Sequence, residues 1–192
     1  GTGTAGTTGG PVWVSEGLYG PLGYPNPSAG GLVIADPAFG ADPGTNAALY
    51  RVWQFAYNGG SLLTEISTDN GLTWRPLFDG ISVNIPSGIF PALAINPTQQ
   101  FISGVWRSQL AFGTRVVLVS NTDGATWNQV SPTLSGTATV TAIAFAPSTF
   151  NTMYAATSDG RVFHTTLPGQ AVGSWVDRSA GLPVGIIKSI TV

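Results

Sequence analysis

The sequence lacks cysteine altogether and has little charge, and both shortages exclude whole classes of function. Without cysteine the chain can form no disulfide, offer no thiolate to a metal and use no cysteine nucleophile. Only 8% of its 192 residues are charged, against roughly 25% in ordinary soluble domains, and only seven are Lys or Arg. Because phosphate recognition needs clustered basic side chains, the sequence predicts no nucleic-acid partner.

Long apolar runs and acid–base groups are scarce as well. No stretch reaches the roughly 18 apolar residues of a membrane helix, so we expect no transmembrane segment. His164 is the single histidine, and its alternating surroundings, RVFHTT, are typical of an ordinary strand residue. No glycine-rich loop opens a helix, and no run of acidic residues has calcium-loop spacing. We therefore expect no cofactor and no metal.

Glycine, proline, threonine and serine take the place of the missing charge. Residues 1–10, GTGTAGTTGG, bury nothing and are predicted to be a flexible leader. The chain starts without Met or a signal peptide, so we interpret it as a mature form, a fragment or part of a longer protein. A surface rich in Thr, Ser, Gly and Asn indicates an extracytoplasmic location: secreted, periplasmic or at the cell surface.

Short apolar runs, broken by turn residues about every ten positions, predict an all-β fold of antiparallel strands. Three landmarks recur in order: an apolar run ending in proline, a turn glycine, and a hydroxyl residue followed by tryptophan. They fall at Pro37, Gly59 and Trp74, then Pro97, Gly113 and Trp127, then Pro147, Gly160 and Trp175. Units of about 50 residues with four strands are typical of β-propeller blades.

The repeat predicts a partial propeller over residues 11–192. Its blades are expected at about 31–80, 90–134 and 140–180, with flanking strands at 12–16, around Trp13, and at 186–192. Predicted strands of the second unit are 91–96, 101–107, 115–121 and 126–131, and those of the third are 140–146, 152–157, 161–166 and 174–178. Three blades cannot close a ring, so we expect a longer parent of about six to eight blades.

The string STDNGLTW, from Ser67 to Trp74, predicts a tight hairpin turn. A short acidic side chain can accept backbone N–H groups inside the turn, and glycine supplies a positive φ. A similar string, SNTDGATW, runs from Ser120 to Trp127. There Thr122 holds the position of the acidic residue, and Asp123 is displaced by one.

These strings resemble the Asp-box, or BNR repeat, of the sialidase-like propellers. The matching residues are Ser67, Asp69, Gly71, Thr73 and Trp74 in the first string, and Ser120, Gly124, Thr126 and Trp127, with the displaced Asp123, in the second. Sialidases, xyloglucan hydrolases, sortilin-type receptors and photosystem II assembly factors all carry such boxes. The resemblance implies the fold, and it implies that the box is a structural turn away from any active site.

Catalytic residues are hard to assemble from this sequence. A sialidase needs an arginine cluster, whereas the arginines here are scattered. A glycoside hydrolase needs two carboxylates flanking a sugar bond. Asp69, Asp123 and Asp159 are interpreted as turn residues, and Glu65 is expected to face outward on a strand. Asp36 is therefore the one weak catalytic candidate.

The leading hypothesis is a non-enzymatic propeller that acts as a protein–protein interaction scaffold, or as an accessory or assembly subunit of a larger complex. Aromatic residues in loops are the candidate contacts to a protein partner: Tyr19, Tyr24, Phe39 and Trp106. The alternative is a fragment of a secreted, xyloglucanase-like glycoside hydrolase, or a carbohydrate-binding propeller with a glycan partner.

Overall fold

The described part of the chain is built entirely from strands and connecting turns. The computed structural model describes residues 29–35, 49–54, 62–68, 72–73, 75–76, 92–102, 104–149, 152–166, 172 and 174–192. Regular structure within these ranges is antiparallel β-sheet, which confirms the all-β prediction. No helix among them has the length and apolar character needed to cross a membrane.

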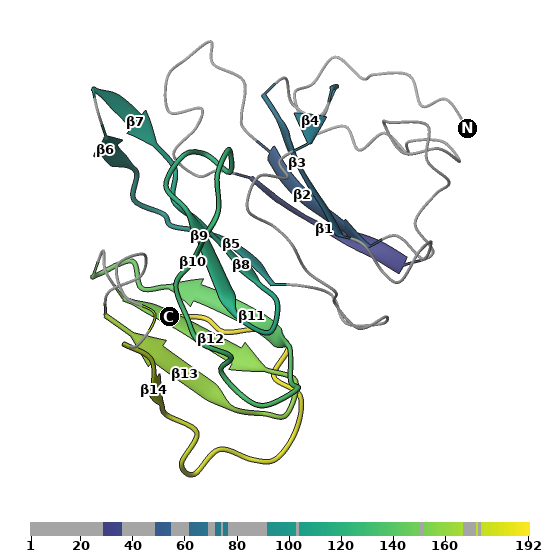
Figure 1. Ribbon diagram of the computed structural model, residues 1–192, viewed down its shortest axis with the longest axis vertical. Coiled ribbons are helices and arrows are strands. Elements are labelled where there is room, and N and C mark those ends of the chain that lie inside the picture. Colours follow the sequence, from purple (N-terminus) through teal and green to yellow (C-terminus); the bar gives the residue numbers. More distant parts are fainter. Residues whose placement is uncertain are drawn as a thin grey trace, which may run out of the picture.

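The strands form three four-stranded sheets and one separate hairpin (Figure 1). The first sheet has the order β1 (Ala29–Ala35), β2 (Leu49–Gln54), β3 (Leu62–Ser67), β4 (Arg75–Pro76). The second has the order β5 (Leu93–Ile95), β8 (Leu110–Gly113), β9 (Val117–Ser120), β10 (Asn128–Gln129). The third has the order β11 (Val140–Phe145), β12 (Met153–Thr157), β13 (Val162–Thr165), β14 (Val176–Asp177).

The separate hairpin corrects the strand predicted at 101–107. Residues in that range form two short strands, β6 (Gln100–Ile102) and β7 (Val105–Arg107), which pair only with each other. The second strand of the sheet is β8 instead, and it pairs directly with β5. The hairpin is thus an insertion between neighbouring strands, and it projects from the second sheet in Figure 1. The other predicted strands of the second and third units overlap observed strands.

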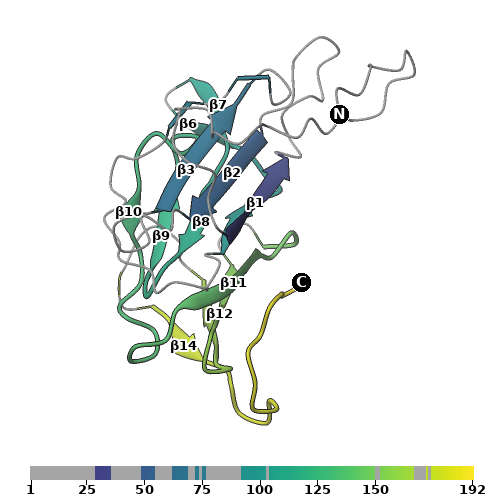
Figure 2. The same ribbon diagram turned by 90° about the vertical axis from the view of Figure 1, so that its right-hand side faces the viewer.

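The second sheet lies between the other two (Figures 1 and 2), and β5 contacts both β1 and β11. Strands β8 and β9 are buried along their whole length, as expected for a sheet that is covered on both faces. One face packs against the third sheet in an apolar core built from Ala92, Ala111, Val117, Val119, Val130, Leu134, Val140, Phe145, Met153, Ala155 and Phe163. On the opposite face Phe112 meets the buried Trp127 edge-on, with ring centroids 6.0 Å apart.

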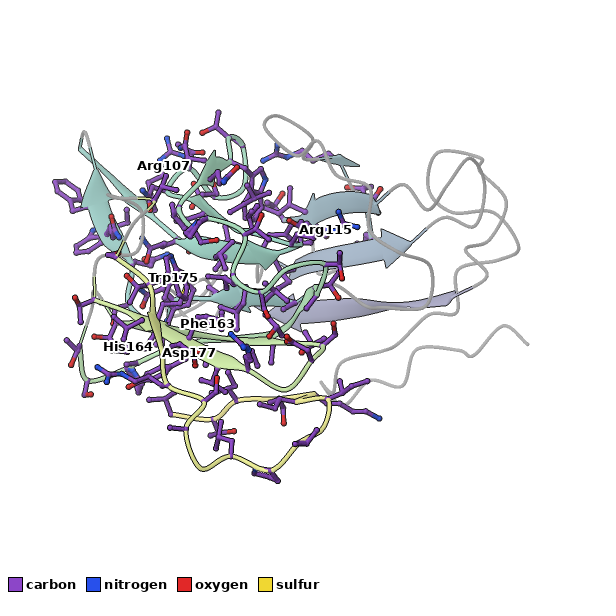
Figure 3. All side chains as sticks on the ribbon, turned by 60° about the horizontal axis from the view of Figure 1, so that its bottom comes forward. Arg107, Arg115, Phe163, His164, Trp175 and Asp177 are labelled. Carbon is purple, nitrogen blue, oxygen red and sulfur yellow. The ribbon has the colours of Figure 1, made fainter. Side chains whose placement is uncertain are left out.

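Close contacts fix the second sheet against the third. The backbone N–H of Val140 donates to the carbonyl of Thr114 at 2.6 Å. The indole N–H of Trp175 donates to the carbonyl of Val130 at 2.9 Å. Figure 3 shows Trp175 near Phe163, on the side of the third sheet that faces the second. Thr114 lies in the β8–β9 turn and Val130 follows the outermost strand β10. The two contacts therefore join the sheets at two separate points, and the sheets cannot slide past each other without breaking them.

Two expectations about individual segments are wrong. Glu65 was expected to face outward, but it is fully buried on β3, where the register places it opposite Arg51 and Pro76. Residues 186–192 were expected to form a flanking strand, but they pair with no strand and are mostly exposed. This segment is attached to the third sheet at Ile187, whose carbonyl accepts the hydroxyl of Thr141 at 2.6 Å.

Candidate functional site

The turn between β9 and β10 is held by two hydroxyl groups. Ser120 Oγ accepts the backbone N–H groups of Thr122 and Gly124, at 3.2 and 2.9 Å. Thr122 Oγ1 accepts the backbone N–H of Thr126 at 2.9 Å and lies 2.8 Å from that residue's own hydroxyl. The hydroxyl of Thr122 therefore makes the hydrogen bond inside the turn that was expected from a carboxylate.

Asp123 points out of this turn instead of into it. Its backbone is left-handed, with φ of 54°, and Gly124 follows with φ of 83°. One carboxylate oxygen, Oδ2, pairs with Arg107 Nη1 at 2.7 Å, and the other, Oδ1, accepts the backbone N–H of Ser108 at 2.7 Å. The expectation that Asp123 is a turn residue is correct for its backbone, but its side chain contacts the chain that leaves β7.

A line of amide side chains connects the base of the hairpin to the same turn. Asn96 Nδ2 donates to Gln109 Oε1 at 2.9 Å, and Gln109 Nε2 donates to Asn121 Oδ1 at 2.9 Å. Both Asn96 and Gln109 are buried. Gln99 Nε2 also reaches Ser108 Oγ at 3.3 Å. The two ends of the hairpin are thus tied to each other and to the sheet through polar contacts that satisfy buried groups.

The hairpin carries two exposed aromatic rings. Phe101 and Trp106 lie directly opposite each other in the β6–β7 register, so their side chains share a face. Their ring centroids are 5.2 Å apart at an interplanar angle of 55°, and their exposed fractions are 62% and 61%. A solvent-exposed aromatic pair on a hairpin whose base is held by hydrogen bonds is typical of a contact surface rather than of a core.

The predicted site residues fall into two groups. Trp106 is exposed on the hairpin, and the second box, Ser120 to Trp127, is described in full. In the first box Ser67 is buried and Thr73 is exposed. The remaining residues lie outside the described ranges: Asp36, Tyr19, Tyr24, Phe39, Asp69, Gly71 and Trp74.

A small charged cluster lies at the edge of the third sheet, where Arg161 is 3.9 Å from Asp159 and 3.3 Å from Asp177. Burial alone would raise the pKa of Asp159, but hydrogen bonds from Ser135 and Thr157, together with Arg161, hold it below its usual value. Hydrogen bonds from the side chain and backbone of Ser179 lower the pKa of Asp177. A lowered pKa favours the ionised carboxylate, whereas the general acid of glycoside hydrolysis has a raised pKa.

His164 lies on β13 (Val162–Thr165), where it is partly buried. Its ring packs at a tilt against Tyr154 on the neighbouring strand, with centroids 4.9 Å apart and an interplanar angle of 47°. No group of three or more metal-ligating side chains occurs in the described part of the chain. The interpretation of His164 as an ordinary strand residue agrees with this placement.

Sequence reasoning missed Phe101 and the contacts that brace the hairpin. The signal was present, because Ser103-Gly104 separates two apolar pairs, and such a dipeptide marks a two-residue hairpin turn. Gly104 indeed has φ of 83°. The Asp123 contacts had no local signal, because their partners lie 15 and 16 residues away. No protein-family model matches the chain, and no curated protein or solved structure is significantly similar to it.

Proposed function

We propose that the chain is part of a β-propeller that works as a non-enzymatic, extracytoplasmic interaction module, either a scaffold or an accessory or assembly subunit. In this proposal the aromatic hairpin, residues 100–107, contacts a protein partner. The observation that carries it is the exposed pair Phe101 and Trp106, held on a hairpin whose base is fixed by buried polar contacts. Aromatic anchors of this kind dominate the energetics of protein interfaces.

A repeated chain path supports the propeller architecture. After the outer strand β10, the chain returns past the β8–β9 turn, where Val140 lies against Gly113, and then starts β11. After β14 it returns in the same way past the β12–β13 turn, where Gly185 lies against Gly160. In both units the outermost strand is thus followed by a segment beside the innermost strand of the same sheet. Propeller blades are connected in this manner.

The charges of the described residues favour interaction over hydrolysis. Asp123 is engaged by Arg107, and both Asp159 and Asp177 contact Arg161. Asp36, the weak catalytic candidate of the hydrolase alternative, lies outside the described ranges. The two functions are distinguished by activity: an enzyme turns over β-glucan, and an interaction module retains a stoichiometric partner.

The test is affinity capture with matched surface variants. The full chain is used as bait on extracytoplasmic fractions of the source cells, alongside Phe101→Ala/Trp106→Ala and the control Leu72→Ala, which removes another exposed apolar side chain. We expect a stoichiometric partner to be retained by the wild type and the control. In the aromatic variant its affinity should fall by about 30-fold or more, as for an interface hot spot.

Two results would contradict this proposal. One is equal capture by the wild type and the aromatic variant, which would place the contact elsewhere. The other is hydrolysis of β-glucans by the chain or its parent with loss of turnover in Asp36→Asn, which would identify a hydrolase.

A further inference from the structure

We infer that Asp123 is a positioning residue, whose carboxylate holds the aromatic hairpin in one orientation against the second sheet. The inference rests on the proposed function of the hairpin and deepens it by naming the group that orients the contact surface. It is carried by the two hydrogen bonds that Asp123 makes outside its own turn.

The turn does not need the Asp123 carboxylate. Ser120 Oγ and Thr122 Oγ1 already accept three backbone N–H groups of the turn, those of Thr122, Gly124 and Thr126. The backbone N–H of Ala125 donates to the carbonyl of Thr122. In the Asp-box pattern the acidic residue stands where this chain has Thr122. The one-residue displacement therefore leaves a carboxylate that is available for a contact beyond the turn.

Both oxygens of that carboxylate meet the chain where it leaves the hairpin. Oδ1 accepts the backbone N–H of Ser108, which fixes the position of the chain just after β7. Oδ2 pairs with the guanidinium of Arg107, which limits rotation of the hairpin about the axis of β7. The Asp123 side chain is only 19% exposed, so water competes weakly for it. Hydrogen bonds to an ionised group are also stronger than neutral ones. Figure 3 shows Arg107 at this end of the second sheet, with Arg115 at the opposite end.

The two hydrogen bonds of the Asp123 carboxylate, here called the clamp, support a hairpin that is too short to be stable alone. Two strands of three residues each are marginal in water without support from the rest of the fold. Trp106 directly precedes Arg107, so a contact that fixes the backbone at this point also limits where the Trp106 ring can lie. Holding the rings in the orientation that the partner meets lowers the entropic cost of binding.

The experiment moves the carboxylate by one residue without changing the charge. In Thr122→Asp/Asp123→Asn the acidic group returns to the Asp-box position, and asparagine tolerates the left-handed backbone at position 123. We expect the turn and the sheet to persist, while amide hydrogen exchange of residues 100–107 accelerates on the order of ten-fold. The control is Asp159→Asn, in the β12–β13 turn of the third sheet, and it should leave hairpin exchange unchanged.

Arg107→Met provides a second variant that does not touch the turn, and it should accelerate hairpin exchange to a similar extent. If the double variant fails to fold, Arg107→Met decides. Wild-type exchange rates in the hairpin of the folded variants would overturn the inference, whatever happens to partner binding. Accelerated exchange with unchanged partner affinity would support the clamp and contradict the proposed contact role of the hairpin, so the two failures are distinguishable.

Discussion

At the scale of single residues, Gly113 shows how closely the second and third sheets approach. A Cβ atom at this position would lie 2.6 Å from Val140 Cγ1 and 3.3 Å from the Cβ of Ala92. Both neighbours belong to the packed core, so they have little freedom to move. Glycine is therefore required here by space, not by an unusual backbone angle.

We expect Gly113→Ala to lower the free energy of unfolding by about 1–3 kcal/mol through overpacking, as measured by chemical denaturation. The control is the double variant Gly113→Ala/Val140→Gly, which removes both Val140 atoms that the new Cβ would meet, Cγ1 at 2.6 Å and Cβ at 2.7 Å. Its loss should be smaller than the sum of the two single losses, because the substitutions relieve the same clash. Strictly additive losses would show that the sheets do not meet at this point.

The second box shows which parts of a residue's role can be predicted from sequence. The pattern predicted a turn at Ser120 to Trp127, and the structure has one. The pattern could not tell which side chain closes it, because a threonine hydroxyl and a carboxylate both accept a backbone N–H. The redirected Asp123 depends on Arg107, and that contact exists only after the hairpin has folded against the sheet.

At the scale of elements, turn chemistry was a better guide than apolar content. The run from Phe101 to Arg107 is apolar enough for one strand, and it was predicted as one. The glycine at 104 folds it back on itself, and β8 takes the place in the sheet. The outward orientation predicted for Glu65 was wrong because it assumed that one face of β3 is exposed to solvent. Glu65, Ile66 and Ser67 are all buried, so both faces of the strand are covered there.

The contact of Trp175 with Val130 connects the outermost strands of two sheets, because Trp175 directly precedes β14 and Val130 directly follows β10. We expect Trp175→Phe to cost about 1–3 kcal/mol of stability, because the buried carbonyl of Val130 loses its donor. The control is Trp106→Phe, the same substitution at an exposed ring, which should stay within about 0.5 kcal/mol of the wild type. Thermal and urea unfolding of both variants compares them directly. Equal losses would refute a specific role for the cross-sheet hydrogen bond.

At the scale of the whole molecule, stability should depend on pH mainly in the acid range. Asp159 and Asp177 have lowered pKa values in the folded state. Their contribution is therefore fully present above the ordinary carboxyl pKa of about 3.9, and it is lost as the pH falls through the lowered folded-state values. We expect the melting temperature to fall as the pH is reduced from about 5 to about 2.

The check is a series of thermal unfolding curves over this range for the wild type and for Asp159→Asn/Asp177→Asn. The variant should be less stable at neutral pH and should show a flatter acid decline. Val184→Lys/Val192→Lys, at two exposed positions of the C-terminal segment, controls for the change of net charge, because it also raises the net charge by two. A decline of the same steepness in the double variant would assign the acid sensitivity to other groups.

Two of the sequence landmarks, a turn glycine and a tryptophan, stand at contacts between the second and third sheets. The turn at Gly113 lies where the next sheet comes close, and Trp175 bonds back to the preceding sheet. The sequence did not reveal how residues 186–192 continue, because a strand forms only where a neighbour offers backbone partners. The segment runs beside β11, as expected, but it does not form the backbone hydrogen bonds of a paired strand.

The place of the hairpin in the second sheet has a consequence for how this protein could change over time. The backbone N–H of Asn96 donates to the carbonyl of Gln109 at 2.8 Å, so the chain leaves the sheet and re-enters it at adjacent points. Everything between them can be lengthened, shortened or exchanged while β5 and β8 stay paired. New specificities could thus evolve, or be grafted by an engineer, at a single insertion point without redesign of the scaffold that displays them.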